Sequence, residues 1–349
     1  MTGRRPSCRR PPSLKSFLPV AVAMLLLAVL QAALGGATYL VYLSLLVGVN
    51  VILAVSLNIV NGLTGQFSIG HAGFMAVGAY LSAALSLVTR DYRLEVLPEV
   101  VSDQLLFVGS LLAGGVGAAA CGFLVGLPSL RLKGDYLAIV TLGFGEIILV
   151  IVRNSPSLGG ALGLSGTPQR TSFFMVWFWV FLVVLLAKRL LASPHGRSLI
   201  AIREDEVAAE AMGVDTTAYK VRAFVVSSFF AGVAGALFAH FQSIITPGDS
   251  FSFVKSMELV VMVVVGGLGS TTGSLVAAVL LTLLPEGMRA LFISLGGENV
   301  QLAQSIDQLR KPIFGLLLVV MMLTRPQGLF GTSEAWDRRV KLRQKGAPA

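Results

Sequence analysis

Runs of about 20 consecutive apolar residues recur along this chain, and they constrain its fold more than any other feature. A membrane-crossing α-helix needs about 20 such residues, because its backbone polar groups must be satisfied within the helix itself. Only 13% of the residues are charged, whereas about 25% is usual for a soluble domain. The pattern predicts an all-α, polytopic integral membrane protein, because the alternation typical of outer-membrane β-strands is absent from the sequence.

About ten transmembrane helices are expected, including short ones broken by glycine, with both termini in the cytoplasm. Alternating spans then place 19 of the 27 Lys and Arg residues in cytoplasmic segments or at the adjoining span ends, which is the bias that orients membrane proteins. The basic carboxyl-terminal tail requires an even number of spans, so residues 255–285 should cross twice. The expected spans lie near residues 17–34, 38–60, 68–88, 104–127, 135–152, 173–191, 219–241, 255–266, 272–285 and 311–324.

The expected organisation is a basic cytoplasmic tail at residues 1–16, a transmembrane domain at 17–330 and a second basic tail at 331–349. The apolar segment after the first tail is longer than the core of a typical signal peptide, so we interpret it as an uncleaved first span. The formal net charge of +9 comes from basic residues beside the spans and does not indicate binding to nucleic acid. The two cysteines are far apart in the sequence, so they predict neither a disulfide framework nor a metal site.

The sequence contains no motif for nucleotide binding or catalysis. It lacks the Gly-x-x-x-x-Gly-Lys-Ser/Thr phosphate loop, and the segment Gly267–Gly273 does not match the dinucleotide fingerprint. Nucleophile-elbow and His-Glu-x-x-His patterns are also absent from the sequence. We therefore expect no catalytic, cofactor or metal site in this chain, which argues against a membrane enzyme.

A polar loop at residues 192–218 separates two apolar spans. Ser193 and Pro194 can begin a helix, because proline fits the first helical turn. Residues 203–212 are rich in strong helix formers, and Gly213 stands where a helix would end. The loop is either an ordinary cytoplasmic connection or a helical knob presented to a soluble partner.

Two glycine-rich segments interrupt the apolar pattern, at residues 61–73 and 266–273. Glycine breaks at corresponding places in two halves of a transporter indicate discontinuous helices that line a pathway. The alternative is close helix packing through small residues. The candidate residues of the two breaks are Gly65, Gln66, Ser68, Gly70, His71, Gly266, Gly267 and Gly269.

Glu146 lies about eleven residues into its expected span, which places it near the bilayer centre at about 1.5 Å per residue. A carboxylate there normally faces a partner group or a cavity. Glu146 therefore either lines a pathway or ties helices together through a hydrogen bond, and we favour the tie.

Several segments together resemble one family, and their joint order is more specific than any one of them. They are residues 62–80, 130–148, 201–206, 265–270, 284–286 and 325–329. The chain resembles the inner-membrane permease subunits of branched-chain amino-acid ABC importers, and among these the M type. The resemblance covers roughly residues 40–330.

This resemblance implies an importer that works with an H-type permease subunit, two cytoplasmic ATPases that bind ATP and Mg²⁺, and a periplasmic substrate-binding protein in the bacterial inner membrane. The loop at 192–218 would dock on an ATPase. Val207 stands where the docking consensus has Glu, and Leu158 stands where the family has Thr. The residues implied in docking are Arg203, Glu204, Asp205, Glu206, Ala208, Ala209 and Gly213.

Two alternatives stay open. Close relatives of this family carry urea, short amides or other amino acids, so the substrate is less certain than the mechanism. An ion-coupled secondary carrier would need acidic residues at the bilayer centre paired with the glycine breaks, and only Glu146 qualifies.

Overall fold

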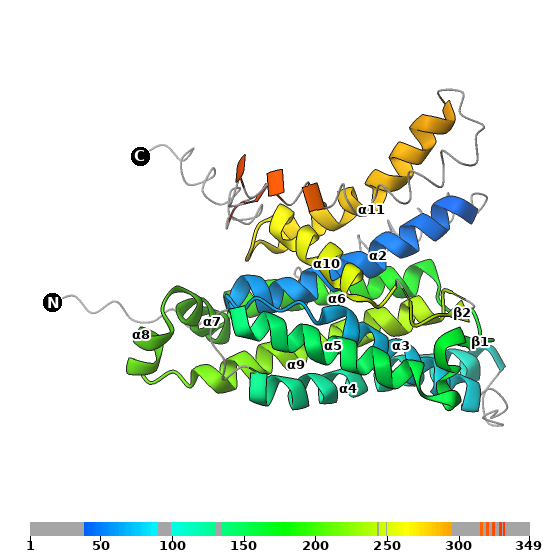
Figure 1. The fold of residues 1–349 in the computed structure, drawn as a ribbon, viewed down its shortest axis with the longest axis horizontal. Coiled ribbons are helices and arrows are strands. Elements are labelled where there is room, and N and C mark those ends of the chain that lie inside the picture. The colour runs from blue at the N-terminus through cyan, green and yellow to red at the C-terminus, as the bar shows by residue number, and fades with distance from the viewer. Residues whose placement is uncertain are drawn as a thin grey trace.

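The computed structural model describes residues 38–89, 99–129, 135–242, 244–248 and 250–294, with isolated residues between 315 and 331. Within these ranges the chain is almost entirely helical, and the helices form a bundle (Figure 1). The two expected tails, the first expected span and most of the last one lie outside the described residues. The bounds are α2 (Thr38–Asn58) with a π-helical extension η2 (Ile59–Leu63), α3 (His71–Val88), α4 (Glu99–Ser129), α5 (Asp135–Arg153), α6 (Phe173–Ala192), α7 (Pro194–Glu204), α8 (Glu206–Ala211), α9 (Thr216–Ala239), α10 (Phe253–Gly266) and α11 (Thr271–Ser294).

Seven helices among the described residues are long and apolar enough to cross a membrane. They correspond to seven of the expected spans, which confirms a polytopic membrane protein. The helix α10 has 14 residues, so at about 1.5 Å per residue it is too short to cross the roughly 30 Å hydrocarbon layer alone. The total of about ten helices therefore stays a prediction, as does the cytoplasmic position of both termini.

The helix α9 packs mainly against α3 and α4 and is the most buried of the candidate spans (Figure 1). Small residues make this packing close: a Cβ atom at Gly78 would clash with the backbone of Gly232, and one at Gly235 with the carbonyl of Met75. Close backbone approach through small residues drives helix association in membranes, where the hydrophobic effect between helices is weak.

The chain also contains one short antiparallel ladder, in which β1 (Leu164–Ser165) pairs with β2 (Ile244–Ile245). An all-α fold did not lead us to expect it. The ladder and two 3₁₀ turns, η4 (Pro156–Leu158) and η5 (Gly160–Leu162), lie at the end of the bundle opposite α7 and α8 (Figure 1). The polar loop is thus separated from the ladder by the length of the spans.

Candidate functional site

The polar loop folds into two short helices, α7 and α8, that project beyond one end of the bundle (Figure 1). We call residues 193–215 the elbow. Ser193 caps α7 by accepting a hydrogen bond from Gly196 N at 3.1 Å, and Pro194 follows in the first turn. Asp205 interrupts the helix and caps α8 by accepting from Val207 N at 2.9 Å and Ala208 N at 3.0 Å. The sequence predicted helix in this loop but not the interruption at Asp205.

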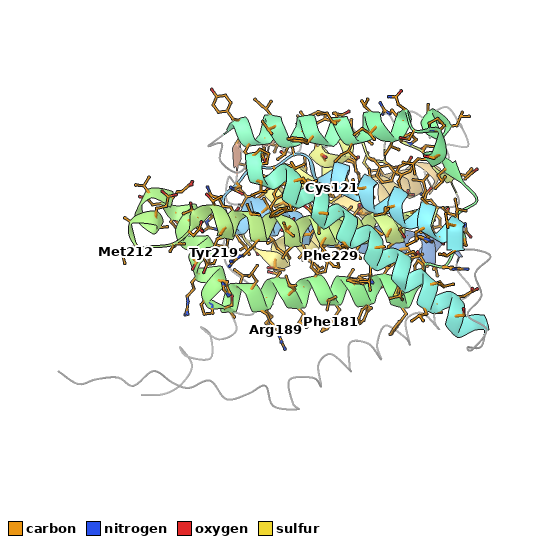
Figure 2. All side chains as sticks on the ribbon, turned by 90° about the horizontal axis from the view of Figure 1, so that it is seen from below. Cys121, Phe181, Arg189, Met212, Tyr219 and Phe229 are labelled. Atoms are coloured by element: carbon orange, nitrogen blue, oxygen red, sulfur yellow. The ribbon has the colours of Figure 1, made fainter. Side chains whose placement is uncertain are left out.

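The tip of the elbow is held to α9 by side chains and exposes apolar groups. The carboxylate of Glu210 accepts from Thr216 Oγ1 at 2.7 Å, and Ala209 is buried. Gly213 has a φ of +84°, the left-handed conformation that glycine adopts readily at a helix end. Val207 and Met212 are 67% and 84% exposed, and Met212 lies at the outer end of the elbow in Figure 2. The tip therefore presents an apolar surface away from the bundle.

The first glycine break, residues 61–73, runs from η2 through a mostly buried turn into the first residues of α3. Asn61 and Ser68 close it reciprocally: Asn61 Oδ1 accepts from Ser68 N at 3.1 Å, and Asn61 Nδ2 donates to Ser68 O at 3.3 Å. A Cβ atom at Gly70 would clash with the carbonyl of Thr141 on α5. The break is therefore packed against neighbouring backbone on more than one side.

The two candidate side chains of the first break have different surroundings. His71 Nε2 lies 2.9 Å from Ser56 Oγ and is buried, so its ring has a hydrogen-bond partner on α2. Gln66 is also buried, and its Oε1 has no partner among the described residues. The described part of the chain contains no group of three residues arranged to hold a metal ion.

The second break, residues 266–273, includes the turn that joins α10 to α11 and lies directly against the first. Gly267 and Gly269 have φ values of +111° and +86°. Gly269 N donates to Asn58 Oδ1 at 2.9 Å, and a Cβ atom at Gly62 would clash with the backbone of Gly269. The sequence predicted each break separately, and the structure brings them into contact.

Arg203, in the last turn of α7, contacts the junction of the two glycine breaks. Arg203 Nη1 donates to Gly62 O at 3.1 Å, so the predicted docking loop touches the predicted breaks. Glu204 pairs with Arg203 at 2.6 Å and is 67% exposed. Two sets of residues that are far apart in the sequence thus form one continuous region.

Glu146 is a residue of α5 and lies outside this region. Its side chain contacts the first residue of α10. Its Oε1 accepts a hydrogen bond from Phe253 N at 3.2 Å, which links α5 to the first residue of α10. An acceptor at that place is favourable, because the first N–H groups of a helix have no partner within the helix. The side chain is half-buried in the chain alone, so its role in lining a pathway stays a prediction.

A buried charged cluster was missed by sequence reasoning. Lys255 Nζ lies 3.0 Å from Asn50 Oδ1 and 3.3 Å from Glu258 Oε2, and Asn50 Nδ2 donates to Thr282 Oγ1 at 3.0 Å. The charged pair is largely buried, with side-chain exposures of 12% and 11%. Opposite charges three residues apart in an apolar segment were the signal that could have found it.

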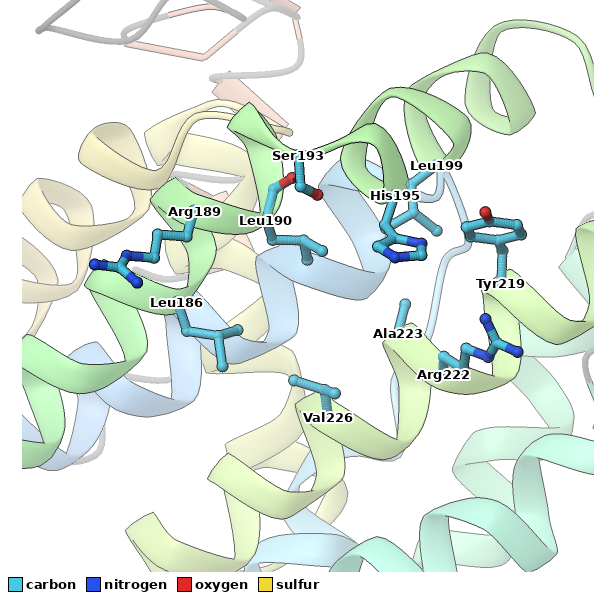
Figure 3. Close-up of a pocket in the computed structure, with 10 residues that line it drawn as sticks. All are labelled: Leu186, Arg189, Leu190, Ser193, His195, Leu199, Tyr219, Arg222, Ala223 and Val226. Carbon is cyan, nitrogen blue, oxygen red and sulfur yellow. The ribbon is translucent and has the colours of Figure 1, made fainter. Parts of the chain in front are cut away.

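A mostly apolar cavity of about 420 Å³ lies between the elbow and the ends of α6 and α9 (Figure 3). Leu186, Leu190 and Val226 are among the residues that line it. His195 of the elbow lies beside Tyr219 of α9, with ring centroids 5.8 Å apart. The first turns of α7 therefore border open space on one side, while Gly196 packs closely against Leu190 on another.

Comparison with known proteins identifies the family. Residues 39–324 match the family described as branched-chain amino acid transport system / permease component. The chain belongs to this family. It is 37% identical over 314 residues to the high-affinity branched-chain amino acid transport system permease protein LivM of Salmonella typhimurium, a match that covers 80% of this chain and 67% of that relative. A probable LivM permease of Methanocaldococcus jannaschii is 29% identical over 318 residues, which cover 81% of this chain and 90% of that relative.

The high-affinity branched-chain amino acid permease LivH of Salmonella typhimurium is less similar, at 22% identity over 306 residues, which cover 81% of this chain and 91% of that relative. Within the family the chain is therefore of the M type, as the sequence motifs indicated. The family match includes the first break, the elbow and the second break, so the whole region described above lies within the shared part of the fold.

Proposed function

We propose that this permease forms one half of a translocation pore in the bacterial inner membrane and carries branched-chain amino acids inward, driven by ATP hydrolysis on separate subunits. The observation that carries the proposal is the family match over residues 39–324. The elbow is consistent with it, because an apolar tip projects from the bundle while the base of the elbow contacts both breaks.

The other half of the pore would be an H-type permease, with two cytoplasmic ATPases below and a periplasmic binding protein above. ATP and Mg²⁺ would bind the ATPases, and this chain itself would be neither an enzyme nor a cofactor-binding protein. ATPase closure would favour one orientation of the pore through differential contacts with the elbow, since a partner shifts an equilibrium only by binding one state better. The elbow and both termini would then be cytoplasmic.

Uptake by the assembled complex in proteoliposomes tests the proposal. Labelled leucine, isoleucine and valine should accumulate only with the binding protein present and ATP available on the ATPase side. Urea, short amides and other amino acids serve as competitors. Strong competition by one of them would indicate that it, and not a branched-chain amino acid, is the substrate. Leucine uptake driven by an ion gradient without ATP would support a secondary carrier instead.

Reporter fusions after Ala349 and after Gly297 test the orientation. The proposal expects the first reporter in the cytoplasm and the second in the periplasm. A periplasmic carboxyl terminus would mean that residues 255–285 cross the membrane once.

A further inference from the structure

Arg203 occupies the point where the elbow meets the two glycine breaks. It lies in the last turn of α7, and its side chain is 25% exposed. Its Nη1 donates to Gly62 O in the first break at 3.1 Å. The same atom would lie 2.9 Å from a Cβ atom at Gly269, and the aliphatic stem of Arg203 would lie 2.6 Å from one at Gly65. One side chain of the elbow therefore packs against both breaks.

The acceptor in this contact is a carbonyl group at a helix end. Gly62 belongs to the final turn of η2, which follows α2 directly. The last carbonyl groups of a helix have no partner within the helix and carry partial negative charge, so a guanidinium group stabilises them. Moving Arg203 away would leave this carbonyl without its cationic partner, and Gly269 without the group that fills the space beside it.

The opposite side of the guanidinium faces the exposed surface of the elbow. Its Nη2 pairs with Glu204 at 2.6 Å, and Nε donates to the same carboxylate at 3.2 Å. Because Glu204 is exposed, a protein that docks on the elbow with a basic group can compete for this carboxylate. Binding of such a protein to the elbow would therefore change the position of the Arg203 side chain.

The helix α7 is connected to α8 by a short joint and borders open space on one side. It is joined to α8 by a single extended residue, Asp205, with a φ of −157°. The cavity of about 420 Å³ lies beside its first turns (Figure 3). Because Leu199 and Ile202 are buried and Gly196 packs against Leu190, a displacement of the elbow would carry the last turn of α7, and Arg203 with it.

We propose that Arg203 is a positioning residue that transmits movement of the elbow to the junction of the two glycine breaks, and so couples ATPase closure to opening of the permease. The contact with Gly62 and Gly269 exists in one orientation of the pore and is released in the other. This inference rests on the proposed function, because it requires ATPases that bind the elbow.

A reversible cross-link tests whether the contact moves. A Cβ atom at Gly65 would lie 3.3 Å from Arg203 Cβ, close to the separation of about 3.5–4.5 Å in disulfides. We would introduce Gly65→Cys and Arg203→Cys into a complex in which Cys8 and Cys121 of this chain are replaced by Ser and Ala, and compare oxidised with reduced protein. Because Arg203→Cys itself removes the guanidinium group, uptake by the reduced variant should already be low, and the quantity measured is the extent of cross-linking.

The rate of cross-linking gives a readout that does not depend on uptake. It should differ between the nucleotide-free complex and the complex trapped with ATP and vanadate. An equal rate in both states, or full uptake by the cross-linked complex, would show that the contact is static and would overturn the inference.

Single substitutions separate transmission from folding. Arg203→Gln should leave assembly with the ATPases normal while uptake per ATP hydrolysed falls about tenfold, and Arg203→Lys should restore part of it because one donor and the charge remain. Arg197→Gln is the matched control, because Arg197 is an exposed arginine on the same helix. Normal uptake by Arg203→Gln in an assembled complex would refute the inference alone, whereas failure of the wild-type chain to bind ATPases would refute the proposed function.

Discussion

Lys220 and Glu206 form an ion pair that fastens the tip of the elbow to the first turns of α9. Lys220 Nζ lies 2.7 Å from Glu206 Oε1, and the side chains are 5% and 28% exposed. The carboxylate that looks like a docking residue in the sequence is therefore occupied within the chain itself. Reversing its charge would place a second cation beside a buried ammonium group, so that change would disturb the elbow before any partner binds.

A double-mutant cycle measures this pair. Glu206→Ala should lower the free energy of unfolding by about 3 kcal/mol, because it leaves the Lys220 ammonium group buried without its partner. Glu206→Ala combined with Lys220→Met should recover most of the loss, since neither charge then remains. Thermal unfolding of the purified permease in detergent gives both values, and equal losses in the single and double variants would contradict the pairing.

Docking is better tested at the exposed apolar tip. Met212→Asp should abolish co-purification with the ATPases, because a charge would be buried in the interface, while the melting temperature of the isolated permease stays unchanged. Thr217→Asp is the control, because it adds the same charge at an exposed position in the first turn of α9, where an acidic group is favourable. Wild-type assembly of the Met212→Asp variant would exclude the tip as the docking surface.

Gly70 in the first break and Gly143 on α5 form a matched pair of glycines, one with close neighbours and one without. Gly70→Val should prevent assembly or transport, because a Cβ atom there would clash with Thr141 O. Gly143→Val on α5 should have a much smaller effect, since nothing lies within 4 Å of its Cβ position. Assembly and uptake are measured separately: lost assembly indicates packing, and lost uptake in an assembled complex indicates a pathway role.

Two substitutions of Glu146 separate a role in holding helices together from a role in lining the pathway. An amide oxygen can still accept from Phe253 N, so Glu146→Gln should assemble and transport almost normally. Glu146→Leu should assemble poorly because the first N–H of α10 loses its acceptor. Good assembly with poor uptake of the Gln variant would assign a charge-dependent pathway role to this residue.

The sequence predicted the helices and both breaks because apolar length and glycine clusters are local properties. It did not predict that Gly62 meets Gly269, or that Arg203 reaches both, because these contacts depend on the path of the chain through the bundle. The interruption at Asp205 had a local signal, since aspartate is a strong N-cap residue. The helix-forming composition on either side of it obscured that signal.

Lys255 is a different case, because it is the first residue of the expected span 255–266 and the sequence predicted no partner for it. In the structure its ammonium group is enclosed with Glu258 and Asn50 between α2 and α10. Removing one partner of a buried pair is costly, so Lys255→Met should lower the free energy of unfolding by about 3–5 kcal/mol. Lys255→Met with Glu258→Gln should regain most of that loss, because no unpaired charge stays buried.

Uptake by this double variant shows whether the cluster of Lys255, Glu258 and Asn50 has a structural role or contacts the substrate. If the pair only holds α10 in place, the double variant should transport amino acids at nearly the wild-type rate once its stability is regained. If the two charges contact a zwitterionic substrate, the double variant should assemble well and yet lose affinity, seen as a raised concentration for half-maximal uptake. Arg189→Met, which removes an exposed cation at the end of α6, should change neither quantity. We expect the first result, because in the structure the lysine and the glutamate already satisfy each other.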